Sequence, residues 1–431
     1  MITITPLGGF FEVGRNSVAL EYNNKIIILD MGFHLERFIE LTEDDIPHKK
    51  HSVRKLVAKG AFPDIRNLRR RRNDVVGIIC SHAHLDHVGA VPFLAKYFSC
   101  PVYGTPFTTS VIKLLCEDKQ TKPQLITQEV GSTITFDHGI SVEFIRVSHS
   151  TPQSSILAIH TPEGTIIYGN DYKNDQTPPH EEATDLNRLK ELKGKVNLLM
   201  LDCLYAAYDE HAPSEQQVRD ELLELDLSDY RAIIATTFSS NISRLITLCD
   251  IADKLGRKVV FLGRSLAKYI QAAADINLVD LEKRGEVIKY SREVAKFLKR
   301  MHSPERYLII TTGHQGEPQA VLGRMVQGLF SFHPQDLVLF SSKIIPTDIN
   351  KKHRRQLEEK LSRVQIIKDK HVSGHAAGKD HDELIRILEP RQLAPSHGTQ
   401  DMMEAFKKRS MKLGYQEKDI FFLKVGERHQ F

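Results

Sequence analysis

The chain has 431 residues, a length that corresponds to about two or three domains. Its 41% hydrophobic and 26% charged residues are typical of a globular protein and exclude a disordered or collagen-like chain. The net charge is only +4, no apolar run reaches the roughly 18 residues of a membrane span, and the N-terminus carries no secretory signal.

The five cysteines are odd in number and none lies in a CxxC pair, so we expect reduced thiols in a cytoplasmic protein without a membrane anchor. The basic charge is concentrated in one segment. Residues 34–73 hold 11 Lys and Arg against 6 Asp and Glu, whereas the remainder holds 48 against 49. The segment ends in four consecutive arginines at 69–72. It is either an arm for a polyanion such as nucleic acid or a solvated insertion.

The first 203 residues predict many strands and few helices. Apolar, β-branched runs predict strands over 2–7, 17–22 and 25–29, and Asn23-Asn24 marks a hairpin turn between the last two. Further strands are predicted over 75–80, 101–103, 141–147, 154–160, 165–168 and 196–201, with one helix over 88–98.

Strands and helices then alternate, which predicts a parallel sheet with helical crossovers. Strands are expected over 232–235, 259–262, 307–311 and 337–340, and helices over 214–225, 243–255, 267–274 and 319–327. A basic helix over 350–362 and a strand over 364–367 follow. We therefore predict a first domain over 1–203, an inserted α/β domain over 204–348, and a return to the first domain over 349–431.

The most informative motif is His82-Ala-His84-Leu-Asp86-His87, directly after a predicted strand. Four potential metal ligands in six residues supply the imidazole nitrogen and carboxylate oxygen donors that hard and borderline cations need. The pair His82 and His84 suits one metal ion. The pair Asp86 and His87, at the turn into a helix, suits a second.

Two further donors follow other predicted strands. His149 comes after the strand at 141–147, and Asp171 comes after the strand at 165–168. Taken alone, either is equally explained as a turn or capping residue. If Asp171 bridges two metal ions, the pair can activate a water molecule and clamp a phosphate, which is the chemistry of hydrolysis.

In order and spacing, Asp30, the HxHxDH string, His149 and Asp171 resemble the metallo-β-lactamase superfamily. Asp202 in LLMLDCLYA, His375 in HVSGHA and His397 in APSHG resemble the three additional motifs of its β-CASP branch. The stretches EVGRN (12–16), APSEQQV (212–218), FSSN (238–241), FLGRS (261–265), TTGHQGEP (311–318) and FSSKIIP (340–346) are similar to the short, archaeal-type ribonuclease J family. The resemblance covers nearly the whole chain.

The resemblance implies an αββα sandwich with an inserted α/β domain, and two zinc ions per chain. One zinc would take His82, His84, His149 and Asp171, and the other would take Asp86, His87, Asp171 and His397. Asp30 and Asp202 would orient ligating histidines. His375 would bind the scissile phosphate and protonate the leaving oxygen, with Asp86 the second catalytic residue.

Residues of two regions are expected to contact the RNA backbone. They are Ser373, Gly374, His375 and Ala376 in the HVSGHA loop, and Ser239, Asn241, Arg264, Ser265, Gly313 and His314 in the inserted domain. His314 stands where the family has a serine, so its contact with RNA stays open.

The function that the resemblance implies is a zinc-dependent ribonuclease that degrades single-stranded RNA from the 5′ end, prefers a 5′-monophosphate, and can also cut internally. A homodimer is the expected assembly. Two alternatives remain: a strict RNA endonuclease of the 3′-end-processing type, and a catalytically inactive RNA-binding scaffold.

Overall fold

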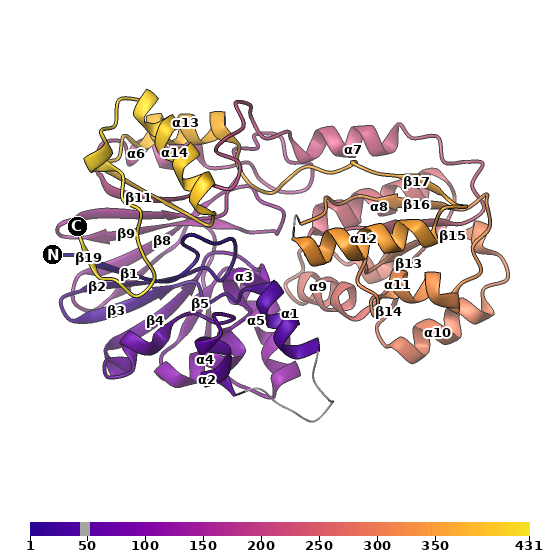
Figure 1. Cartoon of the computed structure of the whole chain (residues 1–431), viewed down its shortest axis with the longest axis horizontal. Coiled ribbons are helices and arrows are strands. Elements are labelled where there is room, and N and C mark those ends of the chain that lie inside the picture. The colour runs from indigo at the N-terminus through magenta and orange to yellow at the C-terminus, as the bar shows by residue number, and fades with distance from the viewer. Residues whose placement is uncertain (44–51, 346) are drawn as a thin grey trace. The chain divides into compact units, whose positions relative to one another are not determined.

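A computed structural model describes residues 1–43, 52–345 and 347–431 of the chain. The chain folds into two compact units (Figure 1). Unit 1 comprises Met1–Gln176, Glu181–Ala212 and Ser373–Phe431, and unit 2 comprises Thr177–His180 and Pro213–Val372. Unit 2 is thus an insertion in the chain of unit 1.

The first sheet of unit 1 has seven strands in the order β19-β1-β2-β3-β4-β5-β6. Strands β1 to β3 pair antiparallel, and β3 to β6 pair parallel. The strands span β1 Thr3–Gly8, β2 Ser17–Tyr22, β3 Lys25–Leu29, β4 Val75–Cys80, β5 Val102–Gly104, β6 Leu125–Thr127 and β19 His429–Gln430.

The second sheet has six strands in the order β18-β11-β10-β9-β8-β7. Strand β11 pairs parallel with both β10 and β18, and β7 to β10 pair antiparallel. The strands span β7 Thr133–Phe136, β8 Ile140–Arg146, β9 Ser155–Thr161, β10 Gly164–Gly169, β11 Val196–Asp202 and β18 Gln392–Ser396.

The two sheets of unit 1 pack face to face with helices on both outer sides. Alternate side chains of each strand reach opposite faces. Ile27 and Leu29 join Leu157 and Ile166 in the core between the sheets, whereas Ile28 packs outward under helices. The first sheet is covered by α1 Leu35–Glu43, α2 Val53–Ala58, α3 Leu85–Val88, α4 Val91–Phe98 and α5 Pro106–Lys119; the second by α6 Leu186–Glu191, α13 Gly378–Leu388 and α14 Gln400–Lys412. The expected αββα sandwich is confirmed.

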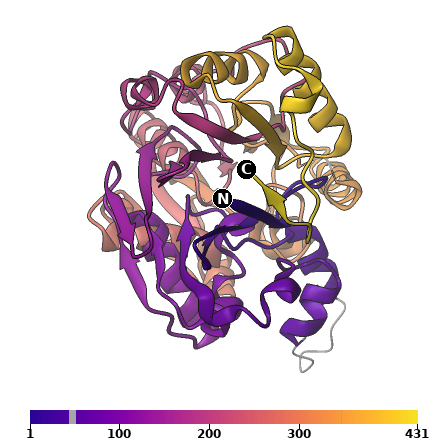
Figure 2. The ribbon, with the colours of Figure 1, turned by 90° about the vertical axis from the view of Figure 1, so that its left-hand side faces the viewer.

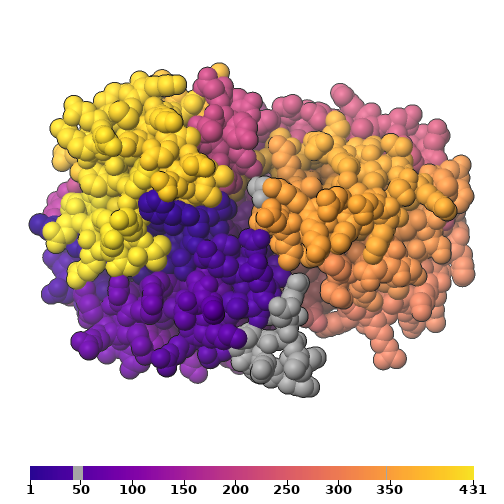
Figure 3. All heavy atoms as spheres, viewed as in Figure 1, coloured from indigo at the N-terminus to yellow at the C-terminus, as the bar shows by residue number. Residues whose placement is uncertain are grey.

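The two ends of the chain meet at one edge of the first sheet. Thr3 pairs with Gln430 and Ile4 with His429, so β19 adds a short strand beside β1 (Figure 2). In the space-filling view the C-terminal residues, in yellow, form a continuous surface next to the indigo N-terminal residues (Figure 3). Chain segments from both ends therefore build unit 1 together.

Unit 2 is a parallel sheet with helical crossovers, as the alternating pattern predicted. Its strand order is β14-β13-β15-β12-β16-β17, and every pair is parallel. The strands span β12 Ile233–Thr236, β13 Lys258–Leu262, β14 Gly285–Ile288, β15 Tyr307–Thr311, β16 Leu337–Phe340 and β17 Gln365–Ile367. The helices span α7 Glu215–Leu223, α8 Ile242–Lys254, α9 Arg264–Asp275, α10 Ser291–Arg300, α11 Val321–Arg324 and α12 Asp348–Lys360.

The unit boundaries differ from the predicted domain boundaries, which fall after residues 203 and 348. The larger difference is at the second boundary, because β17 extends the unit 2 sheet beside β16. Leu357 and Leu361, on and just after α12, are buried in the unit 2 core. The chain therefore returns to unit 1 only at Ser373.

The basic segment 34–73 contributes α1 and α2 on the first sheet, although neither helix was expected from the sequence. Phe38 stacks on Phe33 with ring centroids 4.7 Å apart and lies near Phe62, which anchors this segment to the core. Residues 44–51 of the segment lie outside the described residues. Among the described residues, no helix is both long and apolar enough to span a bilayer.

Candidate metal centre

The HxHxDH string lies on the loop that leaves β4 and enters α3. His84 is the residue before the helix, in an extended conformation, and Asp86 and His87 lie in its single turn. The backbone after β3 packs closely here, because a Cβ atom on Gly32 would lie 1.5 Å from the Asp86 carbonyl oxygen. A glycine at position 32 is what allows this approach.

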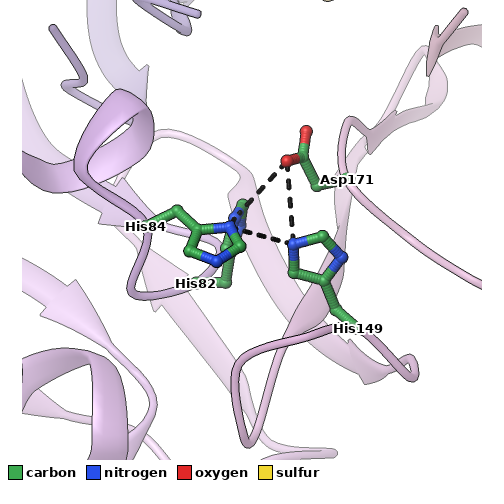
Figure 4. A group of neighbouring side chains, drawn as sticks. All are labelled: His82, His84, His149 and Asp171. Carbon is green, nitrogen blue, oxygen red and sulfur yellow. Dashed lines mark hydrogen bonds and ion pairs between the residues drawn. The ribbon is translucent and has the colours of Figure 1, made fainter. Parts of the chain in front are cut away.

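A first donor cluster brings together His82, His84, His149 and Asp171 (Figure 4). Asp171 Oδ2 lies 3.6 Å from His82 Nε2 and 3.8 Å from His149 Nε2. His84 Nδ1 lies 3.2 Å from His82 Nε2 and 3.0 Å from His149 Nε2. Three imidazoles and one carboxylate, all buried or nearly so, thus face one point.

A second donor cluster shares Asp171 and adds Asp86, His87 and His397. His87 Nε2 lies 3.2 Å from Asp171 Oδ2 and 3.6 Å from Asp86 Oδ2. His397 Nδ1 lies 3.8 Å from Asp171 Oδ1. Asp171 follows β10, and His397 directly follows β18, two strands that flank β11 in the second sheet. One carboxylate therefore joins both clusters.

Asp30 fixes the ring of His87. Its Oδ2 lies 2.7 Å from His87 Nδ1, which directs Nε2 into the second cluster. Asp30 also accepts hydrogen bonds from the Ser81 backbone N–H at 2.7 Å and the Ser81 hydroxyl at 2.8 Å. The carboxylate is fully buried, so its fixed position also fixes the start of the HxHxDH loop.

Asp202 holds His375 in the same way. Its Oδ2 lies 2.7 Å from His375 Nδ1, and its Oδ1 accepts the Leu204 N–H at 2.7 Å. The other ring nitrogen of His375 lies 3.7 Å from Asp171 Oδ2. The His375 side chain is 16% exposed, whereas Asp202 is fully buried. His375 therefore borders both clusters and is open to solvent on one side.

Burial dominates the protonation of the first cluster. It lowers the pKa of His82 and His149, and it lowers the pKa of His84 to about 4. These imidazoles stay neutral and keep a lone pair on the ring nitrogen that faces the cluster.

Carboxylates dominate the protonation of His87 and His375. Burial acts to lower both pKa values, but the charge of Asp171 outweighs it, together with Asp86 and Asp30 for His87 and with Asp202 for His375. The pKa of His375 is raised to about 9, and that of His87 is raised well above its ordinary value.

The donor sets fit zinc. Each cluster offers histidine nitrogens and carboxylate oxygens, the ligand types that zinc takes in hydrolases. Asp171 Oδ1 is buried and has no hydrogen-bond partner among the described residues. A buried anionic oxygen without a partner is costly unless a cation is bound beside it. The residues present therefore match a metal centre.

Asn16 lies in the second cluster, although sequence reasoning quoted it only as part of EVGRN. Its Nδ2 lies 2.6 Å from His397 Nδ1, 2.8 Å from His87 Nε2 and 3.2 Å from Asp86 Oδ2. The residue is 1% exposed, and its Oδ1 has no partner in the described structure. The signal that could have found it is a polar residue directly before a buried strand.

The HVSGHA loop packs against the first cluster. A Cβ atom on Gly374 would lie 2.8 Å from the His149 ring, and the Gly374 carbonyl oxygen lies 2.6 Å from His149 Nδ1. The Ser373 hydroxyl accepts the His375 N–H at 3.2 Å. Ala376 is buried, and its N–H donates to the Tyr172 carbonyl. Ser373 and His375 are thus the more open side chains of this loop.

The expected RNA contacts in unit 2 lie in loops at the carboxyl edge of its sheet. The hydroxyls of Ser239 and Ser265 are 2.9 Å apart, and Arg264 beside them is exposed. Asn241 is buried, and its side chain accepts the Arg244 N–H at the start of α8, which makes it a helix cap. Gly313 and His314 follow β15 at the same edge.

His314 packs its ring on Phe238, with ring centroids 4.3 Å apart. Its carbonyl oxygen accepts a hydrogen bond from Arg354, and burial lowers its pKa. These contacts give His314 a packing role within unit 2.

The four arginines at 69–72 are not equivalent. Arg71 forms ion pairs with Glu21 at 2.6 Å and with Asp74 at 2.9 Å. Arg72 lies over the ring of Tyr97. Arg69 and Arg70 are exposed. Only part of this run is therefore available to a polyanion.

Comparisons with family models cover most of the chain. Residues 11–236 match the metallo-beta-lactamase superfamily, and residues 230–356 match the beta-CASP domain of ribonuclease J. Residues 363–421 match a Zn-dependent metallo-hydrolase RNA specificity domain.

Similar proteins match this chain over nearly its whole length. The chain is 40% identical to a ribonuclease J of Pyrococcus abyssi over 99% of this chain and 96% of that protein. It is 38% identical to a ribonuclease J of Methanocaldococcus jannaschii, over 99% and 98%. It is 30% identical to a ribonuclease J of Mycobacterium tuberculosis, over 99% of this chain and 74% of that one. A solved Enterococcus faecalis protein of unknown function, 19% identical over 99% of both chains, shares the fold with a TM-score of 0.68.

Proposed function

The chain belongs to the ribonuclease J family of the metallo-β-lactamase superfamily and is a zinc-dependent ribonuclease; we propose that it binds two zinc ions and degrades single-stranded RNA from the 5′ end. The observation that carries this proposal is the pair of donor clusters joined by Asp171. Such a pair is suited to hydrolysis of a phosphodiester bond.

We assign one zinc to the first cluster and one to the second. Two zinc ions in this position would activate water and neutralise the charge of the attacked phosphate. Asp171 would hold both, and Asp30 would keep His87 in the ring orientation that presents Nε2. Asn16 would border the second zinc, because its side-chain amide lies beside the ring nitrogens of His87 and His397 that face this cluster.

His375 is proposed to bind the scissile phosphate and to deliver a proton to the leaving oxygen. Its position supports this role, because Asp202 holds Nδ1 while the other face of the ring borders the clusters and reaches solvent. The products would be a 5′-phosphate on one fragment and a 3′-hydroxyl on the other.

The direction of degradation is tested with RNA labelled at its 5′ end. A 5′→3′ exonuclease releases labelled mononucleotide from the first time point, whereas a strict endonuclease of the 3′-end-processing type releases internal fragments first. Two RNAs that differ only in a 5′-monophosphate or 5′-triphosphate test the end preference. A pocket shaped for one phosphate rejects three by crowding, so faster decay of the monophosphate RNA is expected. Equal rates, or decay that starts internally, would remove the exonuclease assignment.

The alternative of an inactive RNA-binding scaffold is tested by metal analysis. A nuclease of this design binds about two zinc ions per chain, whereas a scaffold binds none. All seven expected ligands lie in the two clusters, which favours the nuclease.

Two further proposals concern the location of the protein and its oligomeric state. All five cysteines are buried and free of disulfides, which favours the reducing cytoplasm. The homodimer stays a prediction, and its test is the mass of the chain in solution by light scattering across a concentration series.

A further inference from the structure

Helix α10 of unit 2 carries a basic face that the donor clusters do not explain. Its apolar side is buried, since Val294 and Leu298 lie in the unit 2 core and Phe297 packs edge-on against Tyr307. Eight residues of the other side and of the preceding turn are exposed, among them Ser291 and Glu293. The other six are together called the α10 surface: Lys289, Tyr290, Arg292, Lys296, Lys299 and Arg300.

The five cations of the α10 surface lie on one short helix and the turn before it. Arg292, Lys296 and Arg300 follow at intervals of four residues, which places them on one helical face. Like charges at this spacing repel, and Arg292 in the first turn also opposes the helix dipole. Within the described part of the chain, none of the five forms an ion pair with a carboxylate. The helix dipole favours Lys299 and Arg300 in the last turn, but it does not account for Lys289, Arg292 or Lys296.

Some cations elsewhere in unit 2 have carboxylate partners, whereas others, such as the exposed Lys351 and Lys352 on α12, are without a salt bridge in the described part of the chain. Lys283 pairs with Asp280, Lys368 with Glu358, and Lys370 with Glu221. The α10 surface is therefore a place where unit 2 leaves positive charge uncompensated, as a binding surface for a polyanion does.

An exposed aromatic ring accompanies the charge. Tyr290 is 52% exposed, and Lys289 Nζ lies 5.5 Å from its ring centroid. A tyrosine ring among cations is the combination that single-stranded nucleic acids use, with bases stacking on the ring and phosphates on the cations. An anionic membrane is less suited, because the apolar side of α10 is already buried in the core.

The α10 surface continues from loops already proposed to contact RNA. The Gly263 N–H donates to the Ile288 carbonyl at 3.0 Å, which places Lys289 beside the start of α9. Arg264 and Ser265 are the first residues of that helix. Because α10 crosses from the end of β14 back to the start of β15, only the N-terminal part of the α10 surface, with Lys289, Tyr290 and Arg292, lies at this carboxyl edge.

We propose that the α10 surface is an accessory binding site for single-stranded RNA, which holds segments of the substrate beyond the nucleotides at the donor clusters. The inference rests on the proposed function for the identity of the polymer. The proposal predicts that binding strength depends on substrate length, because only RNA long enough to reach the α10 surface gains the extra contacts.

The test compares two triple variants of the intact zinc protein with equal loss of charge. R292A/K296A/R300A removes three cations of the α10 surface, and K283A/K368A/K370A removes three ion-paired cations. Binding of a long phosphorothioate RNA is followed by fluorescence anisotropy across a salt series. The α10 triple variant is expected to bind more weakly and to lose about 0.7 from the log–log salt slope per lost phosphate contact, roughly 2 in all. The control is expected to change the slope little.

Length and stacking give two independent readouts. The loss of kcat/KM in the α10 triple variant is expected to be larger on the long RNA than on a short oligonucleotide. Tyr290→Ala is expected to weaken binding of the long RNA several-fold with an unchanged salt slope, while Tyr290→Phe retains binding because the ring remains.

Equal slopes for the two triple variants would overturn the proposal, as would equal losses on short and long RNA. Weaker binding to phosphatidylserine vesicles without weaker RNA binding would reassign the surface to lipid. Wild-type protein that binds RNA through the α10 surface but hydrolyses none would reject the proposed nuclease and leave the binding surface standing.

Discussion

The donor clusters of unit 1 and the α10 surface of unit 2 each bring together like charges or polar groups that repel one another. The two regions differ in whether these groups are buried and have partners. In the clusters most rings and carboxylates are buried, and some are held by a buried partner, as Asp30 holds His87. On α10 the cations are exposed and unpaired. The difference predicts two kinds of response to mutation: residues that act as one unit fail together, whereas exposed charges contribute separately.

The largest effect is expected from the proposed metal ligands. His84→Ala and Asp86→Ala should each lower RNA hydrolysis by more than about 10⁴-fold, because each removes a ligand of the centre that supplies both the nucleophile and the phosphate clamp. Each variant should also bind less zinc by elemental analysis. His138→Ala, at an exposed histidine of the same unit, is the control. Near-normal turnover with both metals present would show that the ligand assignment is wrong.

His375 should behave differently from the ligands that surround it. His375→Ala is expected to keep its zinc and to slow cleavage by about 10²–10⁴-fold, the range for a lost general acid. RNA with a better leaving group at the scissile bond should recover part of the rate. Loss of zinc in this variant would make His375 a ligand and reject the role proposed for it.

Mutation of Glu143, in a half-buried cluster of unit 1, should have an effect intermediate between mutations in the donor clusters and mutations of exposed charges. Burial acts to raise the pKa of Glu143, but His160 and Arg188 outweigh it and lower that pKa from 4.5 to about 2. A carboxyl with a lower pKa in the folded state stabilises the protein above its unfolded value, and the gain is lost as pH falls toward 2. Because Arg188 is 35% exposed, solvent screening limits the effect to about 1–2 kcal/mol.

The measurement is urea unfolding of Glu143→Gln and wild type at about pH 7 and about pH 3. The variant should be less stable near neutrality, and the difference should shrink at the lower pH. Glu129→Gln, at an exposed acid of the same unit, controls for the loss of a charge. A difference that is equal at both pH values would contradict the assignment.

The smallest effect is expected at the arginine run. Arg71 and Arg72 already have partners in unit 1, so only Arg69 and Arg70 are free to meet RNA. Replacing Arg69 and Arg70 by Ala should lower the log–log salt slope of RNA binding by at most about 0.7 per residue. An unchanged slope would identify the run as part of a solvated insertion.

The local sequence pattern identified the residues that gather in the donor clusters more completely than it identified the helices and strands around them. A short string of ligands after a buried strand can be recognised once the strand itself is predicted, because the ligands lie at the strand's end. The predicted strands at 17–22, 25–29 and 75–80 match β2, β3 and β4. Helix α5 was missed because Thr108, Thr109, Val111 and Ile112 are β-branched and favour strands in isolation. Burial under the first sheet overrides that preference.

Asn16 was missed for a different reason. Its importance depends on His397, which is 381 positions away in the sequence, and no local pattern links the two. The predicted return to the first domain at residue 349 lies earlier than the unit boundary at Ser373. The reason is that β17 is only three residues long and its pairing with β16 depends on tertiary contacts. Contacts between distant segments are what sequence periodicity does not record.

The neighbouring strands β11 and β18 have a consequence for synthesis of the protein. Asp202 pairs in register with Ser396, yet the ribosome makes residues Pro213–Val372 of unit 2 between them. A nascent chain that ends within Pro213–Val372 holds the complete first donor cluster but neither His375 nor His397. A chain that stalls or is cut within unit 2 therefore lacks a working centre, and catalytic competence arrives only with the last part of the polypeptide.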